Sequence, residues 1–131
     1  MIKTIYMLFF VCVFSIGMWA CSNKEEKFKN LNCNQFEMLI QDKNVQLLDV
    51  RTPAEYSEGH LPASLNLNAM DDSFASNIDG NLSKDFPVAV YCRSGKRSRK
   101  AADILVKKGF VVYNLDKGIN NWKEEGRDIE Q

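Results

Sequence analysis

The chain has 131 residues and carries 17 Lys and Arg against 17 Asp and Glu, which suits a single domain. Because there is no basic surplus, the composition argues against a general nucleic-acid-binding surface. The four cysteines stand in unrelated settings, so they indicate neither a disulfide framework nor a metal site. We expect no metal and no cofactor.

The first twenty residues have the composition of a targeting segment. Lys3 is their one charge, and an apolar stretch leads to Met18, Trp19, Ala20 and Cys21. This pattern resembles a bacterial lipoprotein signal, in which a peptidase cuts before a cysteine that receives a diacylglycerol. The resemblance implies a signal peptide over residues 1–20 and lipidation at Cys21, although Met18 and Trp19 depart from the usual residues of that motif.

The alternative is an uncleaved anchor, because the apolar stretch falls just short of the roughly 20 residues that span a bilayer comfortably. Under both interpretations the domain is membrane-anchored outside the cytoplasm, on the periplasmic side or at the cell surface. Residues 21–30 are short of apolar periodicity and rich in charge, so we assign them to the lipidated N-terminus and a solvated tether. The folded domain is predicted over residues 31–131.

The domain begins with a predicted helix and a predicted strand. Asn34 and Glu37 have the spacing of a capping box, and the apolar residues that follow share one face, which predicts a helix over residues 35–42. Residues 45–50 have the composition of a buried strand. Alternation of helix and strand patterns from here onward is typical of an α/β domain with a mostly parallel sheet.

The middle of the domain begins with a strong helix start. Thr52 is followed by proline and, three residues on, by Glu55, which predicts a short helix that Gly59 ends. A short strand is predicted over residues 63–67. Residues 68–86 are polar and predicted to form a loop, with one helical turn near Phe74.

The last third contains the most apolar predicted strand. Residues 87–91 (PVAVY) form this strand, which runs directly into Cys92. A helix over residues 97–108, a strand over 110–115 and a closing helix over 118–125 follow. Cys92 is therefore predicted at the carboxyl end of a strand and before a helix N-terminus, where open α/β sheets place their ligands.

The setting of Cys92 favours a reactive thiolate. A helix N-terminus and nearby cations lower a thiol pKa, and residues 93–100 contain five cations. Gly95 lets the backbone turn so that successive N–H groups can converge on one anion. We therefore predict that this loop binds a negative group beside the sulfur.

Three motifs in order resemble the rhodanese family. They are residues 47–56 (LLDVRTPAEY), residues 58–63 (EGHLPA) and residues 92–98 (CRSGKRS). The resemblance covers about 100 residues and implies a five-stranded, mostly parallel sheet flanked by helices on both faces. It also implies a sulfurtransferase that moves sulfane sulfur from thiosulfate or a similar small anionic donor to a thiol or cyanide acceptor.

The resemblance assigns roles to individual residues. Cys92 is the nucleophile that carries the persulfide, and the substrate-binding residues are Arg93, Ser94, Gly95, Lys96, Arg97 and, as a minority hypothesis, Arg51. Structural support is assigned to Asp49, Glu55 and His60. We expect Asp49 and Arg51 to form ion pairs at a strand end, with Glu55 or a loop arginine as further partners.

Three alternatives remain open at this point. A persulfide relay or binding module that serves a partner protein needs the same thiolate. A phosphatase or arsenate reductase needs Cys-x5-Arg, whereas Arg97 follows Cys92 after four residues and Ser98 takes the position of that arginine. Cys33 is interpreted as a packed or surface thiol, with a resolving disulfide to Cys92 as the alternative.

Overall fold

A computed structural model of the chain describes residues 27–131. The predicted signal peptide, the predicted lipidation site Cys21 and the tether as far as residue 26 lie outside the described residues. Within residues 27–131, no helix combines the length and the apolar composition needed to cross a membrane.

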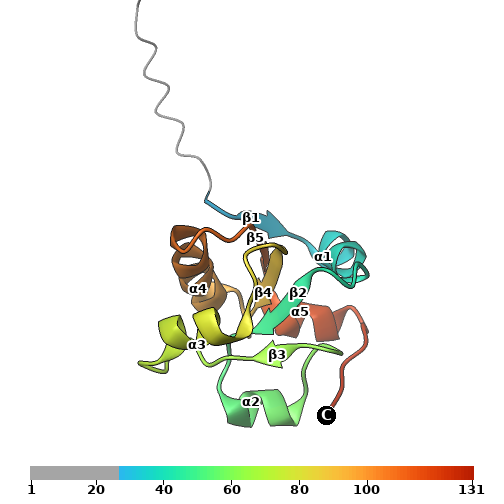
Figure 1. Cartoon of the computed structure of the whole chain (residues 1–131). Coiled ribbons are helices and arrows are strands. Elements are labelled where there is room, and N and C mark those ends of the chain that lie inside the picture. The colour runs from blue at the N-terminus through green and yellow to red at the C-terminus, as the bar shows by residue number, and fades with distance from the viewer. Residues whose placement is uncertain (1–26) are drawn as a thin grey trace, which may run out of the picture.

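Strands and helices alternate along the described part of the chain (Figure 1). The strands are β1 (Lys29–Leu31), β2 (Gln46–Asp49), β3 (Leu65–Asn66), β4 (Val88–Tyr91) and β5 (Val112–Leu115). The helices are α1 (Cys33–Ile40), α2 (Pro53–Glu58), α3 (Phe74–Asn81), α4 (Lys96–Lys107) and α5 (Gly118–Glu124).

The strands form one sheet with the order β1-β5-β4-β2-β3. Each neighbouring pair of these strands is parallel, so the predicted five-stranded α/β fold is confirmed. The central strand β4 lies between β2 and β5, and all four of its residues are buried. Its carboxyl end therefore opens at the middle of the sheet edge, where parallel sheets bind ligands.

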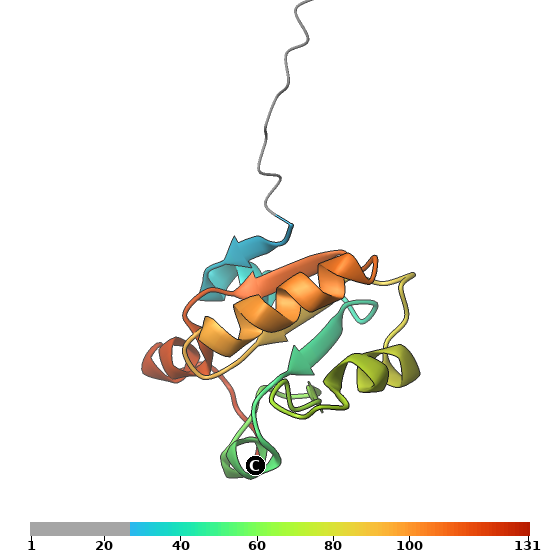
Figure 2. The same ribbon diagram turned by 90° about the vertical axis from the view of Figure 1, so that its left-hand side faces the viewer.

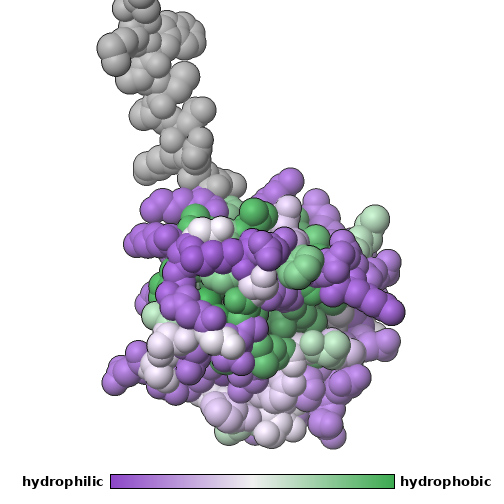
Figure 3. All heavy atoms as spheres, in the orientation of Figure 1, coloured by the Kyte–Doolittle hydropathy of each residue, from purple (hydrophilic) through white to green (hydrophobic). Residues whose placement is uncertain are grey.

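Helices cover both faces of the sheet (Figures 1 and 2). On one face, α3 and α4 bury Phe74, Ile78, Ala101, Ala102 and Leu105 against the sheet. On the other face, α1 and α5 bury Cys33, Phe36, Ile119 and Trp122. Hydrophilic side chains dominate much of the outer surface in Figure 3, with apolar side chains exposed near the middle of that face.

The first helix begins earlier than predicted. Asn32, not Asn34, is the N-cap, and Asn32 and Gln35 exchange the two hydrogen bonds of a capping box. Both residue pairs have the required spacing, but the carboxylate of Glu37 bonds to Arg127 near the C-terminus instead. Because both pairs have the same spacing, the sequence does not distinguish them, and in the fold Arg127 bonds to both Asn34 and Glu37.

Two elements exceed the predictions. Residues 68–86 contain the eight-residue helix α3, which buries Phe74 and Ile78, four residues apart. Because its other residues are mostly polar, the sequence shows little helical periodicity. Strand β1 contains two residues of the predicted tether, and Leu31 alone among its three residues is buried. Such a short edge strand is defined by its parallel pairing with β5 and leaves little pattern in the sequence.

Candidate active site in the loop after the central strand

The loop that follows β4 surrounds the sulfur of Cys92. The thiol is only 1% exposed, and the N–H of Gly95 donates a hydrogen bond to its Sγ at 3.1 Å. Helix α4 begins directly after this loop. The sulfur therefore lies inside the turn between the central strand and a helix N-terminus, as predicted.

Hydrogen bonds lower the pKa of the Cys92 thiol. Burial by itself raises this pKa, but donors from the Ser98 hydroxyl and from the backbone N–H groups of Ser98, Gly95 and Ser94 outweigh burial. The hydrogen bond found at Sγ itself comes from the Gly95 N–H, and the Ser98 hydroxyl donates to the Gly95 carbonyl oxygen at 3.1 Å. Donors at the start of the helix thus lower the pKa of the sulfur, the charge of Cys92 also interacts with Arg97, and Ser98 had no predicted role.

Position 95 requires glycine, because the backbone of the loop lies against the backbone of Asp116. Its φ of 102° is left-handed, and a Cβ at this position would lie 2.1 Å from the carbonyl oxygen of Asp116. The loop thus rests on the turn between β5 and α5. A side chain at position 95 would push the N–H donor away from Cys92.

The same turn supports the loop from a second glycine. Gly118 has φ of 66°, and a Cβ there would lie 2.4 Å from the carbonyl oxygen of Arg93. The N–H groups of Ile119 and Asn120 donate to the carbonyl oxygens of Cys92 and Arg93 at 2.9 and 3.1 Å. The first turn of α5 therefore holds the back of the active loop, a role that the sequence analysis did not assign to Gly118.

Arg97 joins the loop to α2. Its guanidinium donates to both carboxylate oxygens of Glu55 at 2.7 and 2.8 Å. Glu55 also completes the predicted capping box with Thr52. The Arg97 hydrogen bonds hold the pKa of Glu55 at about 2, below its ordinary 4.5. Arg97, predicted to bind substrate, thus directs its side chain to a structural ion pair with Glu55.

The predicted ion pair between Asp49 and Arg51 is present at the end of β2. Arg51 is 4% exposed, bonds to the Asp49 carboxylate at 2.7–3.1 Å and donates to the Gly59 carbonyl oxygen at 2.7 Å. It also borders a polar pocket of about 110 Å³ that Arg93 lines. Its two bonded nitrogens therefore serve the fold.

The remaining predicted residues divide into exposed loop residues and a structural histidine. Arg93, Ser94 and Lys96 are exposed around the loop, so their side chains are accessible to a small anion. His60 stacks on Tyr56 with ring centroids 3.7 Å apart, and its Nδ1 lies 2.9 Å from the Tyr56 carbonyl oxygen. His60 therefore packs at the end of α2, in keeping with a supporting role.

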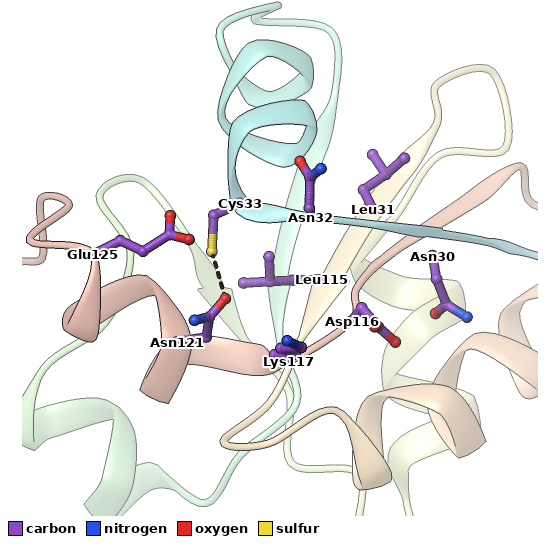
Figure 4. Close-up of a pocket in the computed structure, with 9 residues that line it drawn as sticks. All are labelled: Asn30, Leu31, Asn32, Cys33, Leu115, Asp116, Lys117, Asn121 and Glu125. Carbon is purple, nitrogen blue, oxygen red and sulfur yellow. Dashed lines mark hydrogen bonds between the residues drawn. The ribbon is translucent and has the colours of Figure 1, made fainter.

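Cys33 lies on the other side of the sheet, in a pocket of about 230 Å³ (Figure 4). Its thiol contacts the Asn121 Oδ1 at 3.2 Å. Burial, followed by the charge of Glu125, raises its pKa. Because Cys92 packs in the opposite cluster and both thiols are free, this arrangement does not support a disulfide between them.

No group of three or more His, Cys, Asp or Glu side chains within residues 27–131 is arranged to hold a metal ion. The described site instead offers a buried sulfur, converging N–H donors and exposed cations. These groups suit covalent chemistry on an anionic substrate.

Comparison with known proteins gives a consistent family relationship. The sequence model of the protein family described as the Rhodanese-like domain matches residues 32–125 of this chain. The thiosulfate sulfurtransferase GlpE of Shewanella oneidensis is 37% identical over 98 residues, which cover 74% of this chain and 94% of that protein. The tRNA uridine(34) hydroxylase of Pelagibacter ubique is 35% identical over 104 residues, which cover 79% of this chain but only 35% of that protein.

A solved structure shows the same fold. The rhodanese-related protein of Thermoplasma volcanium aligns with a TM-score of 0.66 and 28% identity, covering 79% of this chain and 98% of that chain.

Proposed function

This chain belongs to the rhodanese-like domain family, and on that premise we propose that it is a sulfurtransferase working through a persulfide on Cys92. The observation that carries the proposal is the buried sulfur of Cys92 in the turn between β4 and α4, where the Gly95 N–H donates to it at 3.1 Å and the loop donors lower its pKa. Such a sulfur is a thiolate over a wider pH range than a free cysteine and is therefore a nucleophile.

In the first step, the Cys92 thiolate attacks the outer sulfur of thiosulfate. A bond forms between Sγ and that sulfur, the sulfur–sulfur bond of thiosulfate breaks, and its electron pair leaves with sulfite. The N–H of Gly95 stabilises the negative persulfide that remains, because it already donates to the sulfur at 3.1 Å. The exposed Arg93 and Lys96 are positioned to attract the donor sulfonate.

In the second step, an acceptor thiolate or cyanide attacks the terminal sulfur of the persulfide. The bond between that sulfur and Sγ breaks, and its electron pair returns to Cys92 as the thiolate. The transfer consumes no external oxidant or reductant.

A turnover assay tests this proposal. Purified full chain, given thiosulfate and cyanide, is expected to release sulfite and thiocyanate in equal amounts. Loss of both products in Cys92→Ser would support the mechanism, and full activity in that variant would overturn it. Phosphatase turnover without sulfur transfer would favour the phosphatase alternative, which lacks support because the Ser98 hydroxyl occupies the place of its arginine.

The second candidate is a persulfide relay to a partner protein. The match within a larger protein named as a tRNA hydroxylase indicates that the domain also occurs outside thiosulfate sulfurtransferases. A relay would form the Cys92 persulfide but turn over slowly with small acceptors. The rate of the second step with small thiols therefore separates the two candidates.

We also propose that the domain is tethered to a membrane outside the cytoplasm through a lipid on Cys21. Support comes from the N-terminal sequence, with its single Lys3 and apolar stretch before the cysteine. Mass spectrometry of protein from the membrane fraction tests this proposal. An intact Met1 or an unmodified Cys21 would contradict it.

A further inference from the structure

The sheet has two opposite edges, because its strands are all parallel. The Cys92 loop lies at the edge where the strands end. The connections into β2, β4 and β5 lie at the other edge, on the right of Figure 2. We call it the amino edge, and it consists of residues 27–29, 41–45, 82–87 and 107–111. Its connections are joined by hydrogen bonds, because Gln46 N–H donates to the Pro87 carbonyl oxygen and Val88 N–H to that of Val111, both at 2.9 Å.

Two apolar side chains are exposed at the amino edge. Phe86 is 42% exposed and Val111 is 61% exposed. They precede the neighbouring strands β4 and β5, whose residues Val88 and Val112 pair in register. On the face shown in Figure 3, which includes this edge, apolar side chains gather near the middle and hydrophilic side chains surround them. An exposed apolar patch with a polar rim is typical of a surface that binds a protein or a membrane.

The rim of the amino edge is cationic. Two acidic residues lie at this edge, against six lysines: Lys27, Lys29, Lys43, Lys84, Lys107 and Lys108. Of these, Lys43, Lys84 and Lys107 are exposed and form no ion pair within residues 27–131. The charges of the whole chain balance, so this surplus is local. It complements a bilayer surface that contains anionic lipids.

The predicted tether joins the domain at the same edge. Strand β1 begins at Lys29, which pairs in register with Tyr113, two residues after Val111. Only six residues separate Cys21 from Phe28, and a chain of that length spans at most about 25 Å in any conformation. A lipid on Cys21 therefore holds the start of β1 within that distance of the bilayer. Of the possible partners for the apolar patch, the membrane is the one that the tether brings to it.

From these observations we propose that the amino edge docks on a bilayer that contains anionic lipids. Phe86 and Val111 enter the headgroup region, and the surrounding lysines pair with lipid phosphates. Docking in this way directs the Cys92 loop away from the bilayer and into the aqueous phase. This inference rests on the proposed membrane tether and adds the orientation of the domain.

Acetylation of the native lysines tests this orientation without an added label. Full chain from the membrane fraction is reconstituted into vesicles of phosphatidylcholine, with or without phosphatidylglycerol, and treated briefly with a membrane-impermeant acetylating reagent. On the anionic vesicles we expect Lys84 and Lys107 to react several-fold more slowly, relative to Lys96 and Lys123, than on the neutral vesicles. Lys96 begins α4 after the Cys92 loop, and Lys123 lines the pocket beside Arg93. High salt should weaken the protection.

A matched pair of substitutions tests the apolar contact. Val111→Asp places a negative charge within the apolar patch and should abolish the protection of the lysines at the amino edge. Met70→Asp is the control and should leave the protection unchanged. Met70 is 69% exposed but lies beyond the carboxyl end of β2, where the Ala69 N–H donates to the Val50 carbonyl oxygen. Chemical unfolding of both variants verifies that each remains folded.

The outcomes separate this inference from the proposed tether. If the membrane fraction does not retain the chain, the tether fails, and this inference fails with it. If the chain is retained but all four lysines react alike on anionic vesicles, the docking surface alone is overturned. Slower reaction of Lys96 and Lys123 would also overturn it, because the Cys92 loop would then face the bilayer. Protection of Lys84 and Lys107 that needs no anionic lipid and grows with protein density would overturn it in favour of a contact between copies of the chain.

Discussion

Cys92 and Cys33 are chemically identical groups in two differently built regions. Both thiols are almost fully buried, at 1% and 2% exposure, and burial raises the pKa of each. Around Cys92, however, the Gly95 N–H donates to the sulfur, and hydrogen-bond donors of the loop lower its pKa. Around Cys33, the thiol meets the Asn121 oxygen and the negative charge of Glu125.

The contrast shows that the direction of the surrounding dipoles decides reactivity, because burial alone acts the same way on both sulfurs. A helix N-terminus is also insufficient, since Cys33 begins α1 yet has a raised pKa. What differs is a glycine-containing turn whose N–H groups face the sulfur. Each prediction below either removes this difference or measures it.

The largest effect is expected from exchanging each sulfur for oxygen. Cys92→Ser should lower thiosulfate-to-cyanide turnover by roughly 10³-fold or more, because the proposed persulfide forms on this sulfur. Cys33→Ser should keep most of the activity. Steady-state assays of both variants measure this contrast, and a large loss in Cys33→Ser alone would reverse the two roles.

The next effect comes from the turn that holds the active loop. Gly118→Ala places a methyl group against the Arg93 and Cys92 carbonyls, so we expect about 1–3 kcal/mol of destabilisation and roughly tenfold lower turnover. Gly126→Ala is the matched control, because Gly126 also has a positive φ of 71° but nothing lies near its added Cβ. Chemical unfolding and turnover are measured for both. Equal activity losses would show that strain, not the contact with the loop, is responsible.

A smaller effect should appear in acid. The folded-state pKa of Glu55 is about 2, below its ordinary 4.5, so its pair with Arg97 contributes stability that is present above the ordinary value and lost as pH falls toward 2. We expect this contribution to be about 1–2 kcal/mol after allowance for solvent. Glu55→Gln should remove it, whereas Glu58→Gln, on the same helix, should not. Unfolding curves across this pH range would contradict the assignment if both variants matched wild type.

The smallest expected effect is on the pKa of Cys92 when one hydrogen-bonding group, the Ser98 hydroxyl, is removed. Ser98→Ala removes the hydroxyl that contributes to the lowered pKa of the Cys92 thiol, so the pKa of Cys92 should rise. Alkylation rate against pH measures this change. Ser57→Ala, an exposed serine on α2, should leave the profile unmoved. An unchanged profile in Ser98→Ala would leave the backbone N–H groups as the only source of the lowered pKa.

Local signals explain why much of the fold and the nucleophile could be predicted. The apolar run before Cys92 and the Thr52 capping box are complete within a few residues, so β4, α2 and the position of the loop followed from the sequence. The resemblance added the number of strands. Helix α3 was underestimated because two buried residues among polar neighbours leave a weak pattern.

The finer structure of the site depends on contacts between distant segments. Arg97 meets Glu55 across 42 residues, and no local pattern shows that this arginine bonds a carboxylate. The role of Gly118 likewise depends on the approach of α5 to the Arg93 carbonyl. Ser98 could have been suspected as a hydroxyl in the first turn of α4, but its direction toward the sulfur required the folded loop.

Mapping of the sulfur after one exposure to thiosulfate tests the central claim most directly. Full chain is treated with thiosulfate, its thiols and persulfides are blocked by alkylation under denaturing conditions, and its peptides are weighed. The account predicts one additional sulfur atom on the Cys92 peptide and none on the Cys33 peptide. Additional sulfur on neither peptide, or on Cys33 in place of Cys92, would contradict it.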